Sequence, residues 1–252
     1  MFGQSVENAW YFESAVHLEA QNRLMYVAEQ GEAFVLLLAA QGMGKTRLLN
    51  RVQEECRRFG HSVVLMNVAA MDDDAFLWHL CGGLSIIAQD HPSRSEMMLA
   101  IRDEISGRTL CHHQTVLLLD DLNRAGDNLH GMIQFLMAVN QQTGGGISVI
   151  AAADGTLCPQ LQQLSALRVG LPQLSDDDSL AFVAGCLKSL KVRSGRVTAD
   201  GMGAIVESCA GSPDRLTRTC ELLKIAQSTH PGLTINADVL AVLTEETLVH
   251  CS

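Results

Sequence analysis

The segment AAQGMGKTRLL (residues 39–49) decides the fold, because it contains most of a phosphate-binding loop. Such loops follow the pattern G-x-x-x-x-G-K-[ST]; Gly44, Lys45 and Thr46 supply its end, whereas Ala39 stands where the first glycine is expected. The apolar segment AFVLLLAA (33–40) precedes the loop, and a helical pattern (44–58) follows it. A buried strand, a glycine-containing turn and a helix form the setting in which backbone N–H groups bind phosphate.

Each part of this loop has an expected role in binding a nucleoside triphosphate. Backbone N–H groups would surround the phosphates, Lys45 would contact the β- and γ-phosphates, and Thr46 would ligate Mg²⁺. Alanine can replace glycine at position 39 if its φ is negative and its methyl group has room. The alternative is a chance Gly-Lys-Thr on an ordinary strand–helix turn. The predicted nucleotide-binding residues of the loop are Ala40, Gln41, Gly42, Met43, Gly44, Lys45, Thr46 and Arg47.

A second segment, TVLLLDD (115–121), supplies acidic residues at the end of another buried strand. Open α/β sheets bind ligands at the carboxyl ends of their strands, so Asp120 is expected to support Mg²⁺ there, through a water molecule. Asp121 is the candidate base, at a position where hydrolytic proteins of this kind usually carry Glu. Its carboxylate would sit back by about 1.5 Å, a displacement that can cost about 10²-fold in rate. Two surface aspartates after a strand are the alternative.

Composition and charge narrow the class of protein. The 252 residues include 47% hydrophobic residues and carry a net charge of −10, which does not suit non-specific binding to nucleic acid. The eight cysteines show no C-x-x-C pair and no zinc-ligand spacing, as expected in a reducing compartment. The apolar segment 33–40 is too short to span a membrane, and the N-terminus lacks a secretory signal. We therefore expect a cytoplasmic protein without a membrane span.

The alternation of apolar strands and helices predicts an α/β domain. Strands are expected at 33–40, 62–69, 115–120, 147–153 and 168–171, with helices at 14–29, 44–58, 72–89, 95–106 and 128–142. Strands that are apolar on both faces indicate a parallel sheet covered on both sides. The spacing of the two motif strands suits a sheet with another strand inserted between them.

A change of pattern near Pro172 separates a second, helical domain. Helical patterns occupy 175–191, 198–209, 212–227 and 236–246, and Ser175 is the predicted N-cap of the first. The predicted domains are residues 1–172, which bind nucleotide, and residues 173–252, a small helical lid. Residues 186–224 carry seven basic and four acidic residues. This excess is either a solvated face or a surface for DNA or a protein partner.

The beginning of the chain carries a sequence pattern that resembles that of a known protein family. It matches F-x-S-x-x-H-x-E-A-x-x-R-L-x-Y at Phe12, Ser14, His17, Glu19, Ala20, Arg23, Leu24 and Tyr26. With the two motifs above, the chain resembles AAA+ ATPases, in the branch of general-secretion-pathway protein A and the transposon-encoded target-selection ATPases. The resemblance runs from about Phe12 to about Gln227. It implies a five-stranded core, a helical lid and ATP bound between them beside the N-terminal helix.

The resemblance also implies roles for four further residues. It places His17 near the base of the nucleotide, where a structural histidine is the alternative. Asp154 is the nearest match to the polar residue that contacts the γ-phosphate after the fourth strand, although an acid facing phosphate is unfavourable. Arg168 matches the arginine that such proteins insert into the site of a neighbouring subunit. Arg215 matches the lid arginine of G-x-P-R but is one place late, in Gly211-Ser212-Pro213-Asp214-Arg215.

Together these features predict an ATPase module that binds ATP and Mg²⁺ and changes its assembly with nucleotide. We expect a homo-oligomeric ring and a protein partner, with DNA as another potential partner. Two biological roles remain open, one in secretion and one as a DNA-associated regulator of transposase type. A different class, a non-hydrolysing switch that recruits a protein partner, is favoured by Asp121 and the shifted lid arginine. We expect Asp121, Arg168 and Arg215 to be the catalytic residues.

Overall fold

The computed structural model describes residues 10–86, 92–125, 129–157, 159–192, 196–230 and 232–248, with side chains as far as Val242. It divides into two compact units. One runs from His17 to Leu171, and the other combines residues 10–16 with the chain from Pro172 onward. The end of the helix predicted at 72–89, the first residue of the helix predicted at 128–142, and Arg193 in the basic segment lie outside the described residues.

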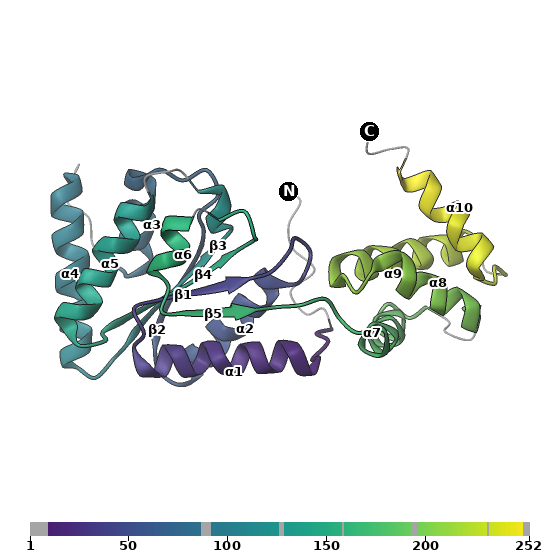
Figure 1. Ribbon diagram of the computed structural model, residues 1–252, viewed down its shortest axis with the longest axis horizontal. Coiled ribbons are helices and arrows are strands. Elements are labelled where there is room, and N and C mark those ends of the chain that lie inside the picture. The colour runs from purple at the N-terminus through teal and green to yellow at the C-terminus, as the bar shows by residue number, and fades with distance from the viewer. Residues whose placement is uncertain are drawn as a thin grey trace. The chain divides into compact units, whose positions relative to one another are not determined.

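The first unit is built on a five-stranded parallel sheet (Figure 1) with the order β2-β3-β4-β1-β5. Its strands are β1 (Phe34–Leu38), β2 (Ser62–Asn67), β3 (Thr115–Asp120), β4 (Ile147–Ala153) and β5 (Leu167–Gly170). The predicted parallel sheet is confirmed. β4 lies between β1 and β3, the strands that precede the two motifs, as their spacing predicts.

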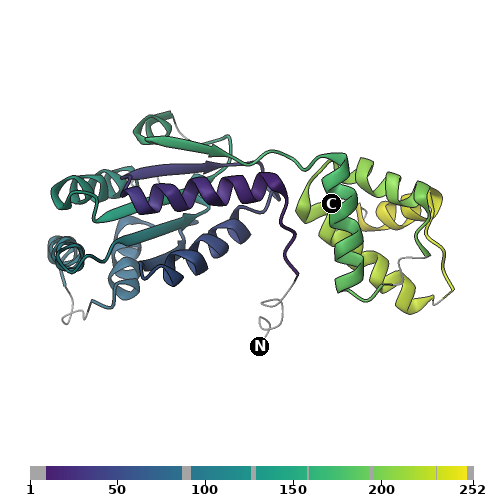
Figure 2. The ribbon, with the colours of Figure 1, turned by 90° about the horizontal axis from the view of Figure 1, so that it is seen from below.

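Helices cover both faces of this sheet (Figures 1 and 2). The helices are α1 (Ala15–Gln30), α2 (Lys45–Arg58), α3 (Asp73–Gly83), α4 (Arg94–Leu110), α5 (Leu129–Thr143) and the short α6 (Pro159–Leu164). Side chains of α3, α4 and α5 form one apolar core with alternate residues of the strands, among them Phe34 and Leu117. Burial of both faces explains why the central strands are continuously apolar.

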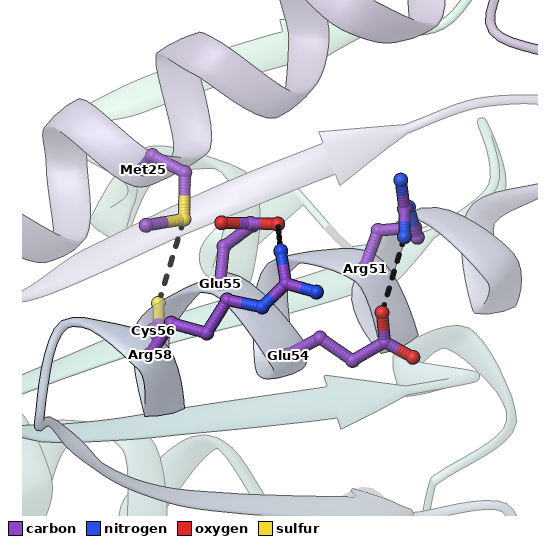
Figure 3. Close-up of polar contacts among 6 residues, drawn as sticks. All are labelled: Met25, Arg51, Glu54, Glu55, Cys56 and Arg58. Atoms are coloured by element: carbon purple, nitrogen blue, oxygen red, sulfur yellow. Dashed lines mark hydrogen bonds and ion pairs between the residues drawn. The ribbon is translucent and has the colours of Figure 1, made fainter.

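Helices α1 and α2 contact each other through buried sulfur atoms (Figure 3). The thiol of Cys56 on α2 lies 3.6 Å from the sulfur of Met25 on α1. Burial, with the nearby charges of Glu29 and Glu55, raises the pKa of Cys56 to about 11, so this thiol stays protonated and serves packing. The solvent side of α2 carries the ion pairs Arg51–Glu54 and Arg58–Glu55.

Two parts of the first unit differ from the sequence prediction. Helix α3 ends at Gly83, whereas the pattern predicts a helix to residue 89. Two glycines lower the helix propensity there, and Ser85 adopts a φ of 62°, which turns the chain. The sequence pattern also misses α6 and the single turn η1 (Leu122–Arg124), because elements this short show little periodicity.

The second unit is helical. It contains α7 (Asp176–Ser189), α8 (Ala199–Cys209), α9 (Pro213–Thr229) and α10 (Ala237–Leu248). Ser175 caps α7, as predicted, by accepting a hydrogen bond from the N–H of Asp178. Trp10 and Phe12, from the beginning of the chain, pack on Phe182 of α7, with ring centroids 5.1 and 5.4 Å from it. The helical unit therefore includes residues that precede the sheet in the sequence.

A glycine turn connects α8 and α9 in this unit. Gly211 has a φ of 67°, and a Cβ atom at this position would lie 2.4 Å from the carbonyl oxygen of Leu174. Leu174 N–H in turn donates to the carbonyl of Gly211. Both the backbone conformation and the close approach require glycine.

We predict that Gly211→Ala destabilises the helical unit by about 2 kcal/mol or more, since alanine there is both strained and in collision. Gly203→Ala is the matched control, because Gly203 lies inside α8 with open space around it. That control should raise the free energy of unfolding by about 0.5–1 kcal/mol. Urea unfolding followed by circular dichroism measures both, and equal stability of the two variants would contradict the turn geometry.

Candidate nucleotide-binding site

The loop between β1 and α2 has the backbone of an anion-binding turn. Gly42 and Gly44 have φ angles of 81° and 89°, and Gly44 is the N-cap of α2. The first N–H groups of α2, from Lys45 onward, have no acceptor within the helix, so they are available to phosphate oxygens. Ala39 is not among the described residues with positive φ, which is the condition under which alanine can replace the usual glycine.

The Lys45 ammonium group folds back onto the loop. It donates hydrogen bonds to the carbonyl oxygens of Ala39 at 2.8 Å and Ala40 at 3.0 Å. Burial lowers its pKa, an effect that exceeds the opposing attraction of Asp154, Asp120 and Asp121. An anion bound in the loop would compensate this desolvated charge. In the loop, Ala40, Gln41 and Arg47 are exposed, whereas Met43 is buried.

His17 supports the loop from α1. This buried side chain donates from Nε2 to the carbonyl oxygen of Met43 at 3.2 Å. A Cβ atom on Gly44 would lie 3.4 Å from the same nitrogen, so the ring packs directly against the glycine turn. The structure thus gives His17 a contact with the phosphate-binding loop; its predicted position beside the base stays a prediction.

Thr46 and Asp120 meet at the carboxyl edge of the sheet. The Thr46 hydroxyl, in the first turn of α2, donates to Oδ2 of Asp120 at the end of β3 with a distance of 2.6 Å. The other carboxylate oxygen accepts from the N–H of Asp121 at 3.0 Å. Asp120 is buried, with 5% of its surface exposed. This contact brings together the two residues that the sequence predicts to support Mg²⁺.

Asp121 is held by a residue that sequence reasoning misses. Its Oδ2 accepts from Nδ2 of Asn67 at 3.0 Å, while Oδ1 of Asn67 accepts from the N–H of Ala69. Asn67 ends β2 opposite Asp120 in the sheet register. The sequence did contain a signal for this residue: Asn67 is the polar residue that ends an apolar strand. Ligands of open α/β sheets bind at the carboxyl ends of such strands.

Asp154 follows β4, and its carboxylate is occupied by neighbouring residues. Thr156 donates from its N–H and its hydroxyl, and Asn123 donates from Nδ2 at 3.0 Å. The N–H of Asp154 returns a bond to Oδ1 of Asn123. The Thr156 hydrogen bonds, with the charges of Lys45 and Arg124, lower the pKa of Asp154, so it is ionised at neutral pH. Direct contact of this carboxylate with a phosphate would be repulsive.

The two predicted arginines belong to different units. Arg168, on the edge strand β5, is exposed and donates to the carbonyl oxygen of Gln162 at 2.7 Å and to the hydroxyl of Ser165 at 3.3 Å. Arg215 is exposed in the first turn of α9, in the helical unit. Their predicted roles toward the γ-phosphate stay predictions.

The residues present fit a magnesium-bound triphosphate. Mg²⁺ prefers oxygen ligands and usually takes only one or two protein groups, with water and phosphate oxygens completing its octahedron. The hydroxyl of Thr46 and the carboxylate of Asp120 are such ligands. Among the described residues, no group of three or more His, Cys, Asp or Glu side chains could hold a metal ion alone. The phosphates would therefore supply the remaining ligands.

Comparison with known proteins identifies a family. The sequence model described as AAA domain matches residues 28–156, about half of the chain. This segment contains the phosphate-binding loop, Asp120, Asp121 and Asp154. No curated protein sequence matches the chain at a significant level.

Solved structures share the fold over most of this chain. Orc1 of Aeropyrum pernix in complex with DNA matches with a TM-score of 0.68 and 13% identity, over 96% of this chain and 68% of that chain. Cdc6p of Pyrobaculum aerophilum matches with a TM-score of 0.70 and 14% identity, over 90% and 66%. The RuvB Holliday junction branch migration motor of Thermotoga maritima gives 0.55 and 14%, over 91% and 67%.

These likenesses concern the fold, because identities this low do not carry function. The chain spans about two thirds of the length of these solved proteins. Among its described residues, no helix combines the length and the apolar character needed to cross a bilayer.

Proposed function

The chain belongs to the AAA domain family, and we propose that it binds ATP with Mg²⁺, hydrolyses it slowly and assembles with other copies in response to nucleotide. One observation carries this proposal: the hydroxyl of Thr46 lies 2.6 Å from the carboxylate of Asp120. The two groups come from separate elements and share the place where a nucleotide-bound magnesium ion is required.

Each residue has a role that follows from its chemistry. The N–H groups from Gly42 to Thr46 bind phosphate oxygens, and Lys45 exchanges its two carbonyl acceptors for phosphate. Thr46 and Asp120 hold the metal, which neutralises charge on the phosphates when bound. Asp121 orients the attacking water and accepts its proton.

Slow hydrolysis follows from two features of Asp121. Its side chain is one methylene shorter than glutamate, so its carboxylate stands farther from the phosphate. In addition, the hydrogen bond from Asn67 occupies one of its oxygens and fixes its direction. A base that is both short and already hydrogen-bonded contributes less to proton transfer.

The proposal also covers assembly with other copies of the chain and binding of a partner. An exposed Arg168 on an edge strand is suited to entering the site of a neighbouring copy, where an arginine can contribute 10³–10⁵-fold in rate. DNA is the proposed partner; two structures that share the fold, Orc1 and Drosophila ORC, are complexes with DNA. The basic excess in 186–224 is the proposed surface for it, in spite of the net charge of −10. The pattern at the beginning of the chain is common to the secretion-type and the transposition-type relatives, so both roles stay part of the proposal.

A non-hydrolysing switch is the second candidate. The hydrogen bond between Asn67 and Asp121 favours it, because that bond withdraws the candidate base from reaction. In this case ATP binding alone would expose a surface for a partner, and the bound nucleotide would persist.

ATP turnover at increasing protein concentration tests the enzymatic proposal. We expect slow turnover whose specific activity rises with concentration, because the active site is completed by a neighbour. Lys45→Ala should abolish turnover and Arg168→Ala should abolish the rise, whereas Arg102→Ala, an exposed arginine paired with Asp103, should change neither. Undetectable turnover with retained ATP affinity would favour the switch, and absence of ATP binding would refute both.

The role of Asn67 has its own test. Asn67→Ala releases the carboxylate of Asp121 and should raise kcat by about three- to tenfold, as expected for the loss of one competing hydrogen bond. Asn22→Ala, an exposed residue of α1, is the control and should leave kcat unchanged. A lower kcat in Asn67→Ala would show that Asn67 orients Asp121 productively.

A further inference from the structure

The candidate site contains a third carboxylate, that of Asp154, in addition to the two aspartates of the second motif. Asp120, Asp121 and Asp154 all lie near enough to Lys45 to act on its charge. An ATP molecule adds further negative charge, which Mg²⁺ offsets only in part. A carboxylate that faces a phosphate is unfavourable, so Asp154 calls for a compensating cation nearby.

Arg124 is a cation in this place that the sequence analysis did not single out. It is the last residue of η1, the single turn that begins directly after Asp121. The residue before it, Asn123, is hydrogen-bonded to Asp154 after β4, so the backbone of Arg124 lies beside this edge of the sheet. Its charge is near enough to Lys45 and Asp154 to lower the pKa of both. The side chain is exposed, and among the described residues it forms no ion pair within 4.0 Å.

Hydrogen bonds with residues that follow three different strands fix the backbone at Arg124. Its N–H donates to the carbonyl of Asp121 after β3, at 2.9 Å, and its carbonyl accepts from the N–H of Ala70 after β2, at 2.8 Å. The preceding residue, Asn123, is joined to Asp154 after β4 by hydrogen bonds in both directions. The backbone of this turn is thus fixed before a ligand binds, so only the side chain of Arg124 has to be ordered on binding.

We propose that Arg124 binds the terminal phosphate of ATP within its own chain and offsets the charge of Asp154. This inference rests on the proposed function, because it assumes that the triphosphate lies in the loop. It assigns Arg124 the discrimination between ATP and ADP, since only ATP carries the γ-phosphate that Lys45 would contact. Arginine suits the task because its planar guanidinium binds phosphate oxygens in pairs.

The positive charge of Arg124 and the negative charge of Asp154 act on the γ-phosphate in opposite directions. Removing the guanidinium leaves Asp154 to repel the γ-phosphate, whereas removing both charges leaves the phosphate with Lys45 alone. The loss caused by Arg124→Ala should therefore be largely reversed by adding Asp154→Asn. A purely structural role of Arg124 would not produce this reversal, because Asp154→Asn cannot rebuild the turn.

Equilibrium binding of fluorescent ATP and ADP analogues with Mg²⁺ tests the proposal. Arg124→Ala should weaken ATP binding by about tenfold or more, as expected for one charge-assisted hydrogen bond, and leave ADP binding within about twofold. Arg124→Lys should retain part of the preference, and the double variant with Asp154→Asn should return close to the wild-type ratio. Arg58→Ala is the matched control, since Arg58 is an exposed arginine at the far end of α2, about 20 Å from Lys45 along the helix.

The outcomes separate this inference from the proposed function. If the wild-type protein binds neither nucleotide, the proposed function fails. If it binds ATP and Arg124→Ala weakens ATP and ADP equally, or neither, Arg124 does not contact the terminal phosphate. An effect on ATP that appears only at protein concentrations where copies assemble would place Arg124 in a neighbour's site and overturn its action within one chain.

Discussion

The site depends on one contact, the hydrogen bond from the hydroxyl of Thr46 to the carboxylate of Asp120 at 2.6 Å. The two residues are 74 positions apart in the chain, and the sheet brings them together because β1 and β3 are parallel strands that end at the same edge. β4 lies between these two strands. The loop after β1 and the first turn of α2 therefore reach across the end of β4 to the carboxylate that ends β3.

Charge is the second constraint on this edge. Burial lowers the pKa of Lys45, and the nearby charges of Asp154, Asp120 and Asp121 oppose this effect only in part. Like charges this close are stable only when hydrogen bonds and cations compensate them. The structure supplies hydrogen bonds to these carboxylates from Thr46, Asn67, Asn123 and Thr156.

The sequence predicts the parts of this protein that depend on local pattern. Continuous apolar strands, the Gly-Lys-Thr turn and the acidic strand end suffice to predict the parallel sheet, the inserted strand and the approach of Thr46 to Asp120. The contacts of Asn67 and Asn123 were not predicted, because they depend on which strands are neighbours and on a single turn, η1, that has no periodic pattern. Asp154 illustrates the same limit: its doubtful role toward phosphate could be argued from its charge, but its bonds to Asn123 and Thr156 require the folded chain.

The magnesium dependence of ATP binding tests the central claim most directly. Titration calorimetry of the wild-type protein with ATP should give an affinity at least about tenfold higher with Mg²⁺ than with a chelator, since Thr46 and Asp120 would hold the metal and the metal would offset charge on the phosphates. Thr46→Ala should remove most of that difference while ATP without metal still binds. ATP binding that is equally strong with and without Mg²⁺, or a full magnesium effect in Thr46→Ala, would contradict the account.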